Sequence, residues 1–226
     1  MCDLRLWYNF HFQQFCILLI QESAHALMHM LAGHALSGEL SVEIYINGYP
    51  KGINYHQSVA FIGKNDAIIE SLTVFQALFF EATCATDLTV ERRIAQNIKE
   101  QQRRVVSVLN LLQMNSMANR RVREFKQPFQ RRRIQLAMAL VTNPSLLFLD
   151  NFFEGLSGSD ALLLTIQLNQ LADEGRTVVC HLNDPREEML ALFNTILLLH
   201  NGQSAFFGSL DSFKTFSCRH GYVDKP

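Results

Sequence analysis

The most constraining feature of this sequence is a short apolar run that ends in a carboxylate. Residues 146–149 read Leu-Leu-Phe-Leu and are followed by Asp150. A run this short, closed by a turn, is typical of a strand that is buried on both faces of a parallel sheet. An Asp at the carboxyl end of such a strand lies where open α/β sheets bind ligands. A core strand that happens to end in Asp is the alternative at this point.

The segments around this run predict an alternation of helices and strands. A basic helix over residues 131–141 leads through Asn143-Pro144 into the strand, and Ser157 to Asp160 open an apolar helix after it. This order predicts an α/β fold with a mainly parallel sheet. The expected strands lie near residues 12–20, 145–150, 177–182 and 195–200. Residues 203–207 should complete a hairpin with the last of these strands through an Asn-Gly turn.

Length and composition fit one globular domain with a sizeable core. The chain has 226 residues, of which 48% are hydrophobic, and a formal net charge of −1. This near-neutral charge gives no reason to expect a nucleic acid partner. The five cysteines form no C-x-x-C pair and indicate reduced thiols in a cytosolic protein. No stretch reaches the roughly 18 apolar residues of a membrane span, so membrane contact is expected only through a partner.

The segment from Arg131 to Leu156 resembles the ATPase half of ATP-binding cassette (ABC) transporters, in particular the G subfamily of white-pigment and sterol half-transporters. The family's segment reads roughly R-K-R-V-S-I-A-x-x-L-V-x-N-P-x-I-L-F-L-D-E-P-T-S-G-L-D. The resemblance extends from about residue 15 to 221. It implies a single nucleotide-binding domain over residues 1–226 with a P-loop NTPase-like core, an antiparallel β part, and a helical subdomain across roughly 72–130. No transmembrane domain is expected in this chain, which reads as an isolated cassette or an incomplete gene product.

The family's phosphate-binding loop, G-x-x-x-x-G-K-[ST], has lost its chemistry in this sequence. When the family's L-A-G is matched to residues 31–33, Leu18 and Ser23 replace the first and last Gly, Ala24 replaces the Lys, and His25 replaces the Ser/Thr. The loop needs Gly so that backbone N–H groups point inward, and Lys to meet the β- and γ-phosphates. Only the helix N-terminus is left to attract an anion.

Histidines are concentrated on the helix predicted over residues 24–35. His25 and His29 are four residues apart and could share a face, with His34 nearby. Two histidines are too few for a closed metal site, and no local Cys or carboxylate completes one. We therefore expect partly exposed histidines on a helix rather than metal ligands.

Two further motifs of the family are also changed. The resemblance places Lys64 where the family has a Gln that reaches the metal and the attacking water, and a Lys would repel a divalent cation. Residues 126–130 stand in place of the signature L-S-G-G-E/Q. Pro128 lacks an N–H and Phe129 is bulky where close backbone approach is required. Only Gln130 fits the signature.

The catalytic positions differ in the same way. Asp150 matches the residue that would hold the Mg²⁺ shell, but Asn151 replaces the Glu that serves as general base in the family. Loss of a general base typically costs roughly 10²–10⁴ in rate. Asn183 replaces the switch His. His181 lies two residues earlier on the same strand face and is the alternative candidate for that role.

Helices outside the site have alternative readings. Residues 71–80 match the segment on which the transporter's membrane part docks, so their apolar face could bind a partner, although core packing explains most of it. The helix over 89–113 carries arginine pairs at 92–93 and 103–104 and an apolar stripe of Val105, Val108, Leu109 and Leu112. The arginines could contact nucleic acid or anionic lipid, but the net charge favours a solvated face.

The sequence thus retains the residues that the family uses to form its fold, but most residues that the family uses to bind and hydrolyse ATP are replaced. The preferred interpretation is a non-hydrolysing pseudo-ATPase, in which ATP and Mg²⁺ binding is weak or absent. It would act as a cytoplasmic partner of another cassette or transporter half, peripheral at the membrane. A weakly active ATPase and a decayed or truncated transporter fragment are the alternatives.

Overall fold

The computed structural model describes residues 16–20, 23–34, 45–46, 49–63, 67–85, 94–182, 185–201 and 203–220. Its centre is a sheet in the order β4-β5-β6-β1-β7-β8. Strands β4 to β7 in this order are parallel, and β8 is antiparallel to β7. The strands are β1 (Cys16–Ile20), β4 (Val59–Ile62), β5 (Leu146–Asp150), β6 (Thr177–Leu182), β7 (Thr195–His200) and β8 (Gln203–Gly208). A separate ribbon pairs β2 (Tyr45–Ile46) with β3 (Tyr49–Pro50).

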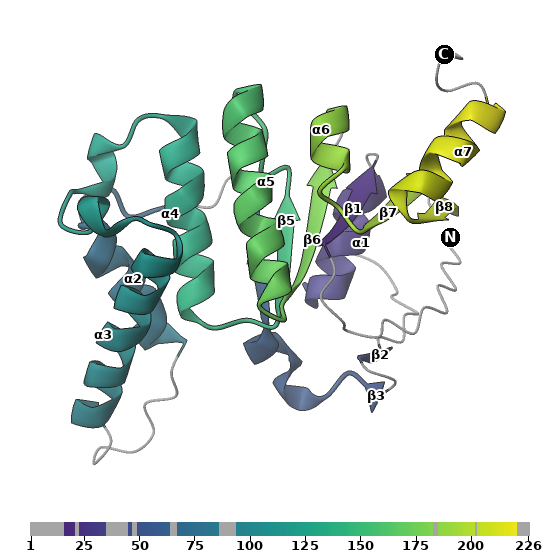
Figure 1. Cartoon of the computed structure of the whole chain (residues 1–226). Helices are drawn as coiled ribbons and strands as arrows, with labels where there is room; N and C mark the ends of the chain where they lie inside the picture. The colour runs from purple at the N-terminus through teal and green to yellow at the C-terminus, as the bar shows by residue number, and fades with distance from the viewer. Residues whose placement is uncertain are drawn as a thin grey trace.

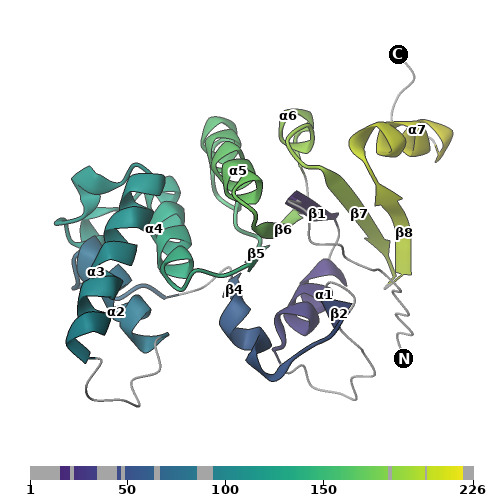
Figure 2. The same cartoon turned by 60° about the horizontal axis from the view of Figure 1, so that its bottom comes forward.

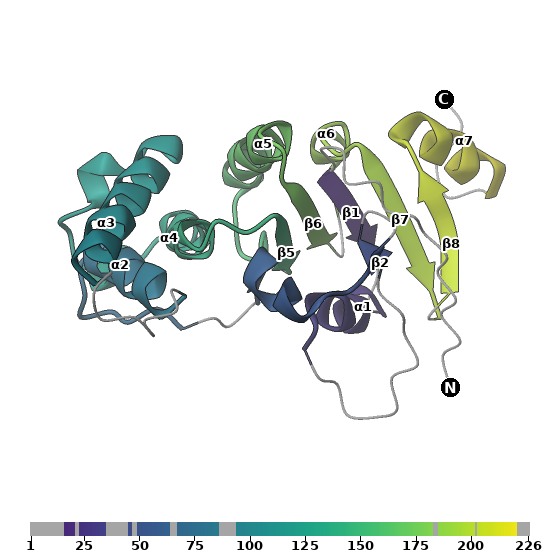
Figure 3. The same cartoon turned by 90° about the horizontal axis from the view of Figure 1, so that it is seen from below.

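Helices cover both faces of the sheet, and a further group of helices lies beyond one of its edges (Figure 1). In the view along the sheet, α5, α6 and α7 lie on one face and α1 on the other (Figure 3). Helices α2, α3 and α4 form a group beyond β4 and β5 (Figure 2). The helices are α1 (Ser23–Ala32), α2 (Val74–Cys84), α3 (Ile94–Leu111), α4 (Pro128–Val141), α5 (Gly158–Asp173), α6 (Glu187–Leu190) and α7 (Leu210–His220). Short 3₁₀ turns are η1 (Ile53–Ser58), η3 (Asn115–Met117) and η4 (Val122–Glu124).

The predicted strand that ends in Asp150 is confirmed as β5, and all five of its residues are buried. Successive side chains of a strand point to opposite faces. Leu147 and Leu149 therefore belong to the core beneath α2 to α5, whereas Leu146 and Phe148 belong to the core beneath α1. By the same alternation, Asp150 faces α1.

The other predicted strands are also present. Those near 177–182 and 195–200 are confirmed as β6 and β7, and β8 completes the predicted hairpin. The strand predicted over 12–20 is observed as β1 in its last five residues, and residues 12–15 lie outside the described part. The parallel α/β core is thus confirmed, since every neighbouring pair from β4 to β7 in the sheet is parallel.

Helix α1 ends earlier than the predicted residue 35, because Gly33 terminates it. Gly33 has φ +82°, a left-handed conformation that Gly adopts without a Cβ penalty. The Gly33 N–H donates to Met30 O and the His34 N–H donates to His29 O. This is a Schellman motif, which satisfies the last carbonyls of the helix. It also brings His34 back beside His29.

Helices α2 and α3 show the packing that their sequences predict. Thr73 caps α2 through a capping box with Gln76, and the helix extends to Cys84, four residues beyond the predicted end at Phe80. The apolar stripe predicted for α3 is confirmed, because Val105, Val108, Leu109 and Leu112 are all buried. None of the described helices combines the length and apolar character needed to cross a membrane.

Candidate functional site

Two adjacent strands end in the polar side chains at the centre of the site. Asp150 of β5 and His181 of β6 are register partners, so their side chains lie side by side on the face covered by α1. The Nδ1 atom of His181 is 2.7 Å from Oδ1 of Asp150. Both side chains are almost fully buried, with exposed fractions of 1% and 3%. A buried carboxylate requires partners of this kind, because an unpaired charge in the interior is costly.

The second oxygen of Asp150 is contacted from α1. His25, in the first turn of that helix, places Nδ1 2.5 Å from Oδ2 of Asp150. An ionised carboxylate only accepts hydrogen bonds, so the Nδ1–H groups of both histidines are the donors. His25 is half exposed, whereas Nε2 of His181 is buried and has no hydrogen-bond partner in the described part of the chain.

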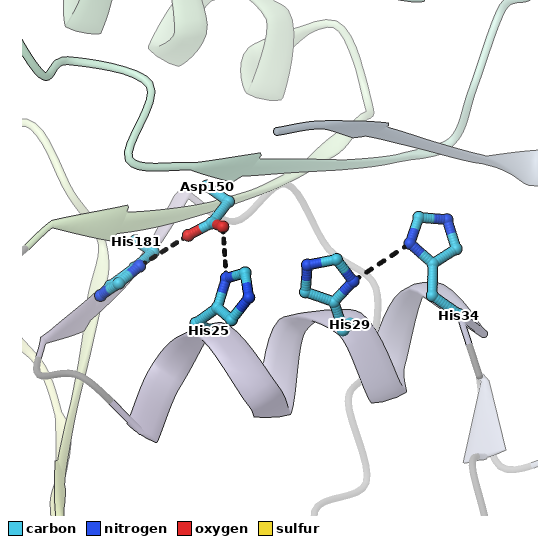
Figure 4. Close-up of polar contacts among 5 residues, drawn as sticks. All are labelled: His25, His29, His34, Asp150 and His181. Carbon is cyan, nitrogen blue, oxygen red and sulfur yellow. Dashed lines mark hydrogen bonds and ion pairs between the residues drawn. The ribbon is translucent and has the colours of Figure 1, made fainter. Parts of the chain in front are cut away.

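Two more histidines continue the cluster, His29 on α1 and His34 just beyond the end of that helix (Figure 4). The ring centroids of His25 and His29 are 4.4 Å apart, and Nδ1 of His29 is 3.3 Å from Nδ1 of His34. Phe61 of β4 packs against the rings of His29 and His34. Burial lowers the pKa of His29, and charge repulsion with His25 and His34 lowers it further, against a smaller opposite effect of Asp150. His29 is therefore held toward its neutral form, which is the form that binds metal ions.

The described positions that the resemblance assigns to the phosphate loop carry neither a lysine nor a glycine. Leu18 lies inside strand β1, where it pairs with Cys180 and Ile196. Ser23 is the first residue of α1, and the side chain of Ala24 is fully buried in the core beneath that helix. A lysine amine has no counterpart at this point. The N-terminus of α1 begins at Ser23, at the position where the resemblance predicts an anion site.

The remaining predicted positions lie elsewhere or outside the described residues. Gln130 is partly buried in the first turn of α4, where Pro128 occupies the first helical position. Asn151 follows Asp150 with φ +49° and is partly exposed. Lys64 and Asn183 lie outside the described residues, so their predicted roles stay predictions.

These residues do not fit a magnesium–nucleotide complex. Mg²⁺ is usually held by one or two carboxylates, waters and the phosphates of the nucleotide. Both carboxylate oxygens of Asp150 are instead engaged by imidazoles, and His25 stands where the family supplies a hydroxyl. Imidazole nitrogens suit Zn²⁺, Ni²⁺ and Cu²⁺ better than Mg²⁺.

Sequence reasoning missed the contact between His25 and Asp150. The sequence predicted partly exposed histidines on this helix, and His25 is half exposed, but a carboxylate 125 residues away in the sequence also contacts it. His25, His29 and Asp150 each offer a ligand atom, and the three atoms lie within 4.8 Å of one another. The signal available in the sequence was the alternation along β5, which places Asp150 on one face but does not say which helix covers that face. The sequence placed His181 on the strand face of Asn183, which lies outside the described residues, and did not predict its contact with Asp150.

A separate cavity of about 250 Å³ lies between β4, α2 and α4. Burial raises the pKa of Glu81, the acidic side chain in its wall. The cavity is lined by Phe61, Ile62, Ala67, Ile68, Glu81, Gln135, Met138 and Ala139. Phe61 lines this cavity and also packs against the histidine cluster.

Comparison with known proteins gives consistent results. A family model described as "ABC transporter" matches residues 26–154. The chain is 28% identical over 205 residues to the broad substrate specificity ATP-binding cassette transporter ABCG2 of Rattus norvegicus, covering 89% of this chain and 30% of the relative. It is 30% identical over 197 residues to the protein scarlet of Drosophila melanogaster, covering 84% of this chain and 28% of the relative. The chain thus spans less than a third of the length of these relatives.

Solved structures with the same fold are ATPase cassettes. CbiO1 from Clostridium perfringens, part of the ABC transporter complex cbiONQ, superposes with a TM-score of 0.75 at 15% identity, covering 92% of this chain and 83% of that chain. A nucleotide-free ATP-binding cassette from an ABC transporter superposes with a TM-score of 0.73 at 15% identity, covering 93% and 88%. The predicted P-loop NTPase-like cassette fold is therefore confirmed.

Proposed function

Because the chain belongs to the ABC transporter family, we propose that it is an ATP-binding cassette of the G-subfamily type that no longer hydrolyses ATP. The helices α2 to α4 are proposed as its helical subdomain. In this proposal the chain acts as a partner or regulatory cassette and contributes a folded surface instead of turnover. Its place would be the cytoplasmic face of a membrane, which it reaches through a second cassette or transporter half.

One observation carries the proposal. The carboxylate that would hold the Mg²⁺ shell is buried between two imidazoles, which occupy both of its oxygens. A magnesium ion bound to Oδ2 would have to displace His25 from that oxygen and would lie against its imidazole without the hydroxyl ligand of the family. Phosphoryl transfer depends on positioning and charge stabilisation by the metal and the loop together. With both altered, the groups that would position the γ-phosphate are missing.

Other positions support the same conclusion. Ala24 is buried in the apolar core, so the chain has no loop lysine to contact the β- and γ-phosphates. Asn151 replaces the general base, and an amide cannot accept a proton from water at neutral pH. Pro128 and Phe129 begin α4 where close approach to a nucleotide on a second cassette would be required. These three replacements of family residues lie in separate segments of the sequence.

The test is phosphate release by the purified chain, alone and mixed with an intact G-subfamily cassette. We expect no turnover above background for the wild type, for Asn151→Glu, for Ala24→Lys, or for the double variant. Asn151→Glu restores a base but leaves the phosphates unheld, and Ala24→Lys restores a charge without the glycines of the loop. Turnover by the wild type that is lost in Asp150→Ala would support the weakly active ATPase instead.

Partnership is measured separately from catalysis. Analytical ultracentrifugation of the chain with an intact cassette should reveal a mixed dimer, and circular dichroism should show a folded chain. A folded chain that forms no mixed dimer would reject the partner role while leaving the loss of hydrolysis intact. A chain that does not fold would favour the decayed-fragment alternative.

A further inference from the structure

We propose that His25, His29 and Asp150 form a binding site for one divalent transition-metal ion of the Zn²⁺ class. Three ligand atoms, one from each residue, lie within 4.8 Å of one another. Two imidazoles four residues apart on a helix, joined by one carboxylate, form a donor set that Zn²⁺ uses when a fourth position stays open. This inference does not depend on the nucleotide chemistry proposed above.

To accept an ion, the three ligand atoms must move from separations of between 2.5 Å and at most 4.8 Å to a more even spacing. Ligand atoms around a tetrahedral Zn²⁺ are each about 2.0–2.2 Å from the metal, which puts them about 3.3 Å apart. The His25 Nδ1 and Asp150 Oδ2 atoms are now 2.5 Å apart, joined by a proton. A metal ion replaces that proton, which leaves to solvent. The half-exposed ring of His25 can rotate outward to make room, and it provides the path from solvent.

The charge of the site favours a cation. Asp150 is buried, and its ion-pair partners among the described residues are both histidines, with no lysine or arginine in contact. A buried carboxylate needs a hydrogen-bonding or positively charged partner, and a divalent ion supplies positive charge at the oxygen that faces α1. Burial holds the carboxylate in a fixed place, so less order has to be imposed when the ion binds.

Neighbouring groups are placed to support the three ligands. His181 donates from Nδ1 to Oδ1 of Asp150, which orients the carboxylate toward α1. Nδ1 of His29 contacts His34, and Figure 4 shows the other ring nitrogen of His29 facing His25. Ligating histidines and carboxylates are commonly held by outer hydrogen bonds of this kind. Phe61 closes one side of the cluster with an apolar ring.

The experiment is a titration of the whole, chelator-treated chain with Co²⁺, followed by visible absorption, and then displacement of Co²⁺ by Zn²⁺. The wild type should bind with a d–d spectrum typical of nitrogen and oxygen ligands, and millimolar Mg²⁺ should not displace the ion. His25→Ala and His29→Ala should each weaken binding by at least about tenfold, the effect of losing an important group at a metal site. His200→Ala removes an exposed histidine of β7 and should leave the affinity unchanged.

Several outcomes would overturn the site. Unchanged Co²⁺ affinity in the His25→Ala/His29→Ala double variant would assign the metal to other groups, including the cysteines. A purely thiolate spectrum would do the same, and so would the absence of any binding by folded wild type. Asp150→Asn adds a third test of the ligand set, but its buried position can impair folding. The two histidine variants, whose folding is checked by circular dichroism, decide the matter without it.

Discussion

At the scale of single residues, the contacts of Asp150 are the most consequential in the molecule. One partner comes from the neighbouring strand, 31 residues later in the sequence, and the other from a helix 125 residues earlier. The two contacts differ in exposure: His181 is buried, and His25 is 54% exposed. Their contributions to stability should therefore differ as well.

We expect His181→Ala to lower the free energy of unfolding by about 3 kcal/mol, because it leaves a buried carboxylate oxygen without a donor. His25→Ala should cost about 1 kcal/mol or less, since water can reach the oxygen that it frees. Urea denaturation of the two variants measures both changes. Equal losses would mean that the burial of the two contacts does not control their strength.

Tyr55 gives the molecule a dependence on alkaline pH. Its hydroxyl donates to Leu31 O, and burial raises the pKa of Tyr55 to about 12. A raised folded-state pKa stabilises the protein fully below the unfolded pKa of about 10, and this stabilisation is lost as pH rises through 12. The loss between pH 10 and 12 should be about 2–3 kcal/mol larger in the wild type than in Tyr55→Phe.

The measurement is urea denaturation at several pH values in this window. Tyr45→Phe is the control, because Tyr45 is 39% exposed and should leave the pH profile as in the wild type. Parallel profiles for wild type and Tyr55→Phe would show that Tyr55 ionises equally easily in both states.

Prediction at the residue level succeeded for the buried strand β5, which depends on local sequence. It failed for the contact of Asp150 with His25, which depends on tertiary packing. The alternation along β5 is a local property, so the buried strand could be read from residues 146–149. The approach of His25 to Asp150 depends on the packing of α1 against the sheet. The spacing of His25 and His29 predicts that they share a face of α1. It does not predict that Asp150 of β5 lies between His25 and His181.

At the scale of elements, helix ends were the least predictable features. The start of α2 follows from the hydrogen bonds of Thr73, which a sequence signature can indicate. Its end at Cys84 and the short helix α6 have no comparable signal, because they depend on packing with neighbouring helices and strands. The end of α1 was signalled by Gly33, whose left-handed conformation stops the helix before residue 35.

The cap of α2 should be measurable by substitution. Thr73→Ala removes the acceptor of the Gln76 N–H and should destabilise the protein by about 1 kcal/mol. Thr73→Ser keeps the hydroxyl and should retain most of the wild-type stability. Thermal denaturation followed by circular dichroism compares the three proteins. A Thr73→Ser variant as unstable as Thr73→Ala would assign the effect to the lost methyl group.

At the scale of the whole molecule, the melting temperature in the presence of Mg-ATP should show whether the chain still binds the nucleotide. A ligand that binds only the folded chain adds about 2.7 kcal/mol of stability at 100 times its dissociation constant. We expect millimolar Mg-ATP to leave the melting temperature unchanged, because the residues at the α1 N-terminus do not fit it. A clear increase with Mg-ATP that disappears in Asp150→Ala would show that nucleotide binding has survived.

The position of β1 in the sheet has a consequence for biosynthesis. This strand lies between β6 and β7, so Ile17 pairs with Val179 and Thr195. A ribosome has to translate more than 170 further residues before both neighbours exist. Until β6 has been translated, neither edge of β1 can pair with its neighbour, and the edge beside β7 waits longer still. Closing so long a loop is slow. Chaperones that shield exposed β-edges on nascent chains therefore have a long interval in which to act on this protein.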